Sequence, residues 1–137
     1  MSGWSAEAGT RTLLVMALAY RLGGNVSALA QPADECIDAT PIPTPVFVED
    51  VNVSYATSSP DDPVQSCTIG GADPHNDSVW YTYTPPVTGY VHASTFGSTY
   101  DTVLSVHTGE CGALTELACN DDKFGFQSKI LYLRVDA

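Results

Sequence analysis

Hydrophobic and polar residues alternate along most of the second half of the chain. The clearest case is residues 78–84, where Val79 and Tyr81 fall on one face of an extended segment and Trp80 and Thr82 on the other. Large rings on both faces predict a central strand. Similar β-prone runs recur elsewhere, and we expect strands over residues 46–48, 51–55, 78–84, 90–96, 102–107, 115–119 and 128–135.

Turn residues separate these runs. Pro85 and Pro86 end one strand because proline cannot donate to a ladder, and Gly89 and Gly97 mark the turns on either side of the next. No stretch after residue 30 has a helical period. The pattern predicts an all-β fold, an antiparallel β-sandwich or jelly-roll of about seven short strands.

The N-terminus has the features of an export signal. Arg11 precedes an apolar run over residues 13–20, and residues 28–30 supply a small-x-small cleavage pattern. The run is too short to span a bilayer. We therefore expect a signal-peptide-like helix within residues 1–30, cleaved before Gln31; the alternative is an ordinary N-terminal helix.

The rest of the chain divides into two parts. Residues 31–45 are rich in proline, alanine and acidic side chains, which predicts an extended lead-in segment without a helix. Residues 46–137 are expected to form one β-sandwich domain. A chain of 137 residues can bury one core but is too short for a catalytic domain with an appendage.

The net charge of the chain indicates which classes of partner are disfavoured. Sixteen acidic residues face five basic ones, and removing the first thirty residues leaves fifteen acidic and three basic, a net charge of −12. Such a field repels nucleic acid phosphates and anionic membrane surfaces, so neither is an expected partner. It attracts divalent cations.

Four cysteines in a short acidic chain favour disulfides and an oxidising, extracellular compartment. Four cysteines allow three pairings. The most economical joins Cys111 to Cys119 and Cys36 to Cys67, since seven residues between Cys111 and Cys119 allow a strand to return beside its neighbour. No pair has the tight spacing of a zinc site, so zinc is not expected.

Three motifs in order resemble one known family. They are VWY at residues 79–81, YDTVL at 100–104 and CNDD at 119–122. Together they resemble the bacterial pre-peptidase C-terminal domain, a secreted β-sandwich module. The resemblance covers residues 36–137. It implies a non-catalytic accessory module that flanks exported peptidases and contacts a protein or polysaccharide surface, or other domains of a longer chain. It also implies a tyrosine-rich final strand beyond Ala137, so we expect the domain to be incomplete there.

The catalytic signals are weak. The chain has no Gly-x-Ser-x-Gly elbow, no His-Glu-x-x-His helix and no phosphate loop. His92 and His107 alternate with apolar residues and are expected on an outer sheet face, while His75 falls in a loop. We predict no enzymatic activity. A hydrolase would need a deep pocket that joins His92 or His107 to a carboxylate and a nucleophile.

Carboxylates form the better candidate site. Asn120, Asp121 and Asp122 follow a predicted strand, and Asp101 begins another. Hard oxygen ligands from two loops at one end of a sandwich are suited to Ca²⁺. The alternative is that Asp101 and Asn120 cap turns while Asp121 and Asp122 are solvated.

Aromatic residues suggest a second kind of site. Six aromatic residues lie between positions 80 and 100, and most are expected in the core. Tyr90, in phase with His92, is the expected exposed exception and a candidate ligand contact. An exposed flat strip of rings would favour a second hypothesis, a carbohydrate-binding jelly-roll.

Overall fold

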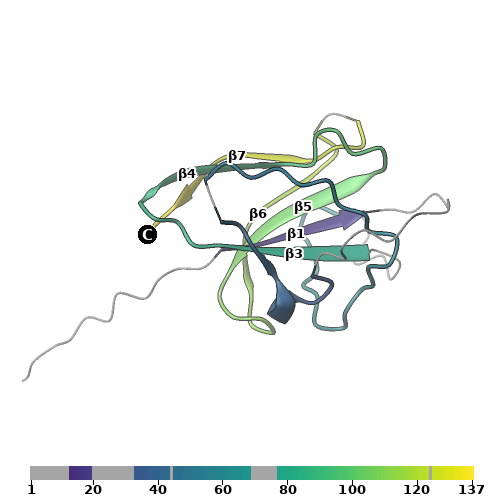
Figure 1. Cartoon of the computed structure of the whole chain (residues 1–137), viewed down its shortest axis with the longest axis horizontal. Helices are drawn as coiled ribbons and strands as arrows, with labels where there is room; N and C mark the ends of the chain where they lie inside the picture. Colours follow the sequence, from purple (N-terminus) through teal and green to yellow (C-terminus); the bar gives the residue numbers. More distant parts are fainter. Residues whose placement is uncertain (1–12, 20–32, 44, 69–76, 124) are drawn as a thin grey trace, which may run out of the picture.

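The computed structural model of the chain describes residues 13–19, 33–43, 45–68, 77–123 and 125–137. Within these ranges the chain forms strands in two sheets and one turn of 3-10 helix, η1 (Cys36–Asp38) (Figure 1). The predicted all-β class is confirmed. Among the described residues, no helix is both long enough and apolar enough to cross a bilayer.

The larger sheet has five strands in the order β2-β3-β1-β5-β6. They are β1 (Leu13–Ala19), β2 (Thr40–Pro41), β3 (Asp77–Tyr83), β5 (Thr102–Thr108) and β6 (Thr115–Asp121). Strand β1 lies at the centre and pairs antiparallel with β3 and β5 along its whole length. β6 pairs antiparallel with β5, while the short β2 runs parallel to β3.

The smaller sheet contains β4 (Gly89–Ser94) and β7 (Lys129–Val135), which pair antiparallel. Figure 1 shows these two strands in a layer of their own beside the larger sheet. A bulge interrupts the pair, because His92 alone lies opposite Leu131 and Tyr132. Tyr132 takes a left-handed backbone conformation there, with φ of 56°. The main chain of Lys129 donates to Asn120 Oδ1 of β6 at 2.7 Å and so links the two sheets.

Five of the expected strands are present, with ends shifted by one or two residues: β3, β4, β5, β6 and β7. The expected strands at 46–48 and 51–55 are wrong, since residues 45–55 form no strand. Pro43 and Pro45 flank the start of this segment and supply no backbone N–H, which disfavours ladder pairing. Strands β1 and β2 were not expected.

The apolar run that suggests a helical leader forms β1 instead, so the expectation of a helix over these residues is wrong. A short apolar run fits a signal-peptide core and a strand buried on both faces equally well, and its periodicity does not distinguish them. Cleavage before Gln31 would remove β1 from the sheet. The other parts of the expected leader, residues 1–12 and 20–30, lie outside the described residues.

The larger sheet has two apolar faces, because alternate residues of each strand point in opposite directions. We call one the closed face: Met16, Trp80 and Val103 form its buried cluster, and the half-cystines 36, 67 and 119 pack against it. We call the other the open face. Its residues come from the same strands and include Val15, Ala17, Val79, Tyr81, Leu104 and Val106.

The disulfides differ from the expected pairing. Cys36 is bonded to Cys111 and Cys67 to Cys119, with Cα–Cα distances of 5.8 and 5.6 Å. The expected Cys111–Cys119 bond is wrong because β6 begins at Thr115 and runs straight through Cys119. At about 3.3 Å per residue, an extended strand carries Cys119 away from the turn that holds Cys111. The bonds instead join the first half of the chain to the β5–β6 hairpin.

Candidate binding groove and acidic cluster

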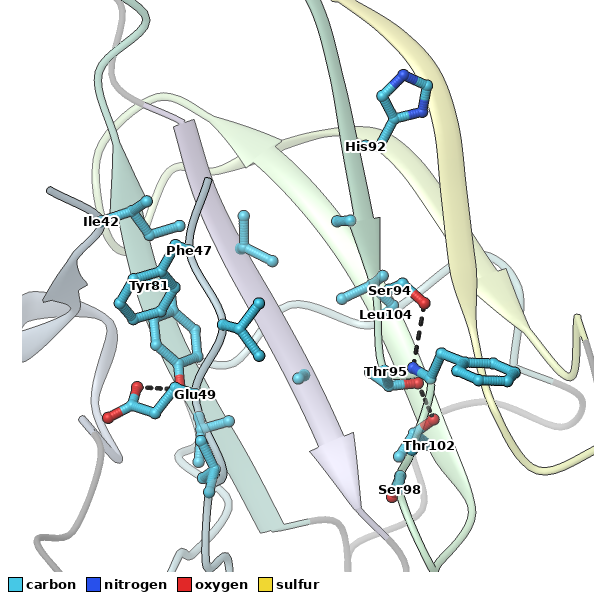
Figure 2. Close-up of a pocket in the computed structure, with 18 of the residues that line it drawn as sticks. Ile42, Phe47, Glu49, Tyr81, His92, Ser94, Thr95, Ser98, Thr102 and Leu104 are labelled. Atoms are coloured by element: carbon cyan, nitrogen blue, oxygen red, sulfur yellow. Dashed lines mark hydrogen bonds between the residues drawn. The ribbon is translucent and has the colours of Figure 1, made fainter. Parts of the chain in front are cut away.

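A groove of about 880 Å³ lies over the open face of the larger sheet. Its floor is apolar and consists of Val15, Ala17, Val79, Tyr81, Leu104 and Val106. Figure 2 shows β1 crossing the middle of the groove, with Tyr81 and Phe47 on one side and β4 on the other. The volume falls within the range of about 300–1,000 Å³ that is typical of ligand clefts.

One wall is the segment 45–53. Phe47 packs edge-on against Tyr81, with ring centroids 5.8 Å apart. The Tyr81 hydroxyl donates to Glu49 Oε2 at 2.9 Å, and the Tyr100 hydroxyl donates to the Val51 carbonyl at 3.2 Å. Burial, reinforced by Glu49, raises the pKa of Tyr81 far above its ordinary value of 10.0. Both tyrosines therefore stay neutral and fasten the segment to the sheet.

The opposite wall is β4 and the turn that follows it. The hydroxyls of Thr95 and Thr102 lie 2.6 Å apart, and the Thr95 amide donates to the Ser128 carbonyl at 3.0 Å. Gln127 Nε2 donates to the Ser98 carbonyl at 2.8 Å. These bonds hold the end of β4 against β5 and the start of β7, so both walls of the groove are preformed.

Three of the four predicted metal ligands lie together. One carboxylate oxygen each from Asp101, Asp121 and Asp122 lies within 4.8 Å of the others. Oδ1 of Asp101 is buried and has no hydrogen-bond partner. The pKa of Asp101 is raised, mainly by burial and also by the negative charge of Asp122. The pKa of Asp121 is raised as well, mainly by burial and also by the charges of Asp122 and Asp101. The three carboxylates therefore repel one another when all are ionised.

The structure gives Asn120 a different role. Its Oδ1 accepts the Lys129 amide, so the side chain links β6 to β7. Asp122 takes a left-handed conformation with φ of 57°, which aspartate tolerates better than most residues. Three hard oxygen donors from two chain segments suit Ca²⁺, with backbone carbonyls and water completing about six ligands.

The histidines have different environments. His107 was expected on an outer face, and this is wrong: it is fully buried on the closed face beside Trp80, with Nε2 2.9 Å from Ser105 Oγ. Burial lowers its pKa below 6.5. His92 is exposed, as expected. His75 lies outside the described residues.

Tyr90 is also exposed, with 66% of its surface accessible. On the neighbouring strand the exposed Tyr132 ring meets His92 edge-on, at 4.8 Å and an interplanar angle of 76°. Figure 2 shows the His92 ring directed away from Glu49 and Ser94, the polar groups of the groove walls. Because the His92 and Tyr132 rings meet edge-on, they do not form a flat strip.

The groove was not predicted from the sequence. Its floor residues are recognisable as strand residues, but their accessibility depends on how far the two sheets cover one another. The only local signal is the apolar run at Val46, Phe47 and Val48, which is β-prone but belongs to no strand of the described residues.

Comparisons with known proteins give no match. No protein-family model matches the chain, and neither the curated proteins nor the solved structures include one that is significantly similar to it.

Proposed function

We propose that this chain is a non-catalytic extracellular binding or accessory module with a β-sandwich fold, of the kind that flanks exported peptidases. The observation that carries the proposal is the apolar groove over the open face. A surface of that size, lined by aliphatic and aromatic side chains with preformed walls, is suited to binding rather than to proton transfer.

Two further observations support a location outside the reducing cytoplasm. Two disulfides link distant parts of the chain, and such bonds persist in oxidising compartments. The strongly acidic composition favours solubility and disfavours polyanionic partners. We therefore propose a secreted or cell-surface location, with a protein or polysaccharide surface as the partner.

Carbohydrate binding is the second candidate. Tyr90, His92 and Tyr132 are exposed on the two-stranded sheet, as a sugar-binding surface would require. The edge-on contact between His92 and Tyr132 argues against a flat stacking platform. The groove therefore favours a protein ligand over a sugar.

A direct test separates the two. Purified oxidised protein is incubated with immobilised unfolded polypeptide and with insoluble polysaccharides, and the bound fraction is measured. We expect retention on polypeptide, reduced by Phe47→Ala and unaffected by Tyr132→Ala, an exposed ring on β7 outside the groove. Retention on polysaccharide that Tyr90→Ala abolishes would establish the carbohydrate alternative instead. Hydrolysis of peptide or ester substrates that survives repurification would overturn the non-catalytic proposal.

We further propose that Asp101, Asp121 and Asp122 hold a calcium ion that stabilises the module. A ligand that binds only the native state adds about 2.7 kcal/mol when it is a hundredfold above its dissociation constant. Thermal melts in chelator and in calcium, at matched ionic strength, test this. The melting temperature should rise with calcium, and Asp121→Asn should reduce the rise while Asp38→Asn, an exposed aspartate outside the cluster, should not. Identical midpoints in both buffers would eliminate the site.

A further inference from the structure

Strand β4 has a free edge. It pairs with β7 on one side, and the described residues place no strand on the other. In a strand, the N–H and C=O groups of every second residue point to the same side, so half of the β4 backbone groups point away from β7. These groups are available to pair with another strand.

The free edge borders the groove. Residues 90–98 line it without a break, whereas no residue of β7 lines it. In Figure 2, β7 lies on the far side of β4 from Phe47 and Tyr81. A chain laid in the groove would therefore run beside β4, on the side that β7 leaves free.

The groove floor suits such a chain. A strand beside β4 would lie over β1 and would point every second side chain at Val15, Ala17, Leu104 and Val106. Leu104 and Val106 belong to the buried cluster beneath the groove, whereas Val15 and Ala17 pack against that cluster and are only partly buried. An added strand would bury apolar surface and satisfy backbone groups in one step.

β4 also carries none of the side chains that usually protect an edge strand. Exposed edges in natural proteins carry lysine, proline or an inward-pointing charge, and the sequence GYVHAS of β4 has none of these. The formally charged residues that line the groove, Glu49 and Asp50, are both acidic. The groove is therefore complementary to an extended apolar segment that carries a basic residue.

We propose that the groove binds an extended polypeptide segment, which adds as a strand to the free edge of β4. Its alternate apolar side chains pack on the groove floor, and a flanking lysine or arginine lies near Glu49 and Asp50. This inference rests on the proposed role as a binding module and specifies its ligand. A second copy of this chain is a poor occupant, because two chains of net charge −11 repel one another.

The probe is the peptide acetyl-Lys-Val-Thr-Val-Thr-Val-Lys-amide, compared with two versions that are N-methylated on one or the other backbone edge. Binding to the full oxidised chain is measured by calorimetry. We expect the parent peptide to bind and at least one methylated version to bind about tenfold more weakly, because methylation removes backbone hydrogen bonds. Equal affinity of all three peptides would overturn strand addition.

Paired variants locate the site. Phe47→Ala removes part of a groove wall and should weaken binding about tenfold, as loss of an aromatic contact does. Phe126→Ala, at an exposed phenylalanine outside the groove, should leave affinity unchanged. The double variant Glu49→Gln, Asp50→Asn should weaken binding about threefold, and its charge-matched control at Glu35 and Asp38 should not. Equal effects within either pair would place the peptide elsewhere.

Hydrogen exchange and mass spectrometry complete the test. Peptide binding should slow amide exchange within β4, and unchanged exchange there at saturating peptide would overturn the proposal. The peptide is also recovered and weighed after incubation. Intact peptide that does not bind would refute strand addition while the module proposal stands, whereas cleaved peptide would refute the non-catalytic function itself.

Discussion

The two faces of the five-stranded sheet are built from the same strands but are covered to different extents. On the closed face, Trp80 is fully buried, and its indole N–H donates to Asp62 at 3.2 Å. Both disulfides reach this face. On the open face, Val15 and Ala17 are only partly covered, and the groove lies above them.

This difference in coverage gives the two faces different roles: the closed face contributes to stability, and the open face is available for binding. Where loops are crosslinked over the sheet, the apolar residues contribute their full burial energy to folding. Where the second sheet covers only part of the face, the remaining apolar surface is available to a ligand. Each strand serves both purposes, because neighbouring residues point in opposite directions.

The largest predicted effect concerns β1, which contributes to both faces. Removing residues 1–30 deletes the strand that pairs with β3 and β5. We expect the fragment 31–137 to lose cooperative unfolding, because the missing pairing and burial are comparable with a total stability of about 5–15 kcal/mol. Circular dichroism during thermal denaturation measures this.

The same experiment distinguishes a strand from a leader. A fragment 31–137 that unfolds cooperatively at the temperature of the full chain would contradict the role of β1 and favour a cleaved leader. A matched control lacking residues 1–10 keeps β1 and should unfold like the full chain.

The next effect concerns the crosslinks of the closed face. Replacing Cys67 and Cys119 together by alanine opens a bond between residues 52 apart in sequence, which costs about 4 kcal/mol in the chain-entropy model. Replacing Cys36 and Cys111 opens a longer loop of 75 residues, but Cys111 is exposed, so its removal leaves no cavity in the core. We therefore expect a smaller loss of stability from this pair. Urea denaturation measures both. Non-reducing peptide maps that recover Cys111 linked to Cys119 would contradict the arrangement.

The sequence predicts the features that depend on neighbouring residues and does not predict those that depend on residues far apart in the chain. Alternation is local, so the strands from β3 onward could be located within two residues. The pairing of β1 with β3 depends on residues more than fifty positions apart, and the apolar run over 13–19 carries no local sign of it. The disulfide pairing could not be predicted either, because each bond joins residues that are far apart in the sequence.

The candidate sites show the same limit. Asp121 and Asp122 are adjacent and Asp101 immediately precedes the neighbouring strand β5, so their proximity could be inferred from one hairpin. The groove could not, because it depends on how the β4–β7 pair sits over the larger sheet. The burial of His107 was missed because β5 is buried on both faces and alternation there does not identify an outer side.

A smaller effect compares adjacent residues of β1. Met16 is buried on the closed face, and its sulfur accepts Gln65 Nε2 at 2.9 Å, so Met16→Ala should cost about 2–5 kcal/mol. Val15 lies half-buried at the groove, and Val15→Ala should cost about 1 kcal/mol. Denaturant titrations of the two variants measure the difference. Equal losses would mean that both faces are equally packed.

The smallest effect is the pH dependence that the closed face imposes through His107. Burial lowers its pKa below the unfolded value of 6.5, an effect that the negative charge of Glu116 partly offsets. The unfolded chain therefore takes up a proton more readily, and stability should fall as the pH drops below 6.5. The slope is at most about 1.4 kcal/mol per pH unit for one group.

His107→Gln isolates this contribution, because glutamine cannot be protonated while every carboxylate of the chain remains. Denaturant titrations between pH 7 and pH 5 should show a steeper loss of stability in the parent than in the variant. The same substitution at the exposed His92 controls for the change of residue type. If the parent and His107→Gln lose stability at the same rate, a charge is tolerated on the closed face, and the contrast between the two faces fails at this residue.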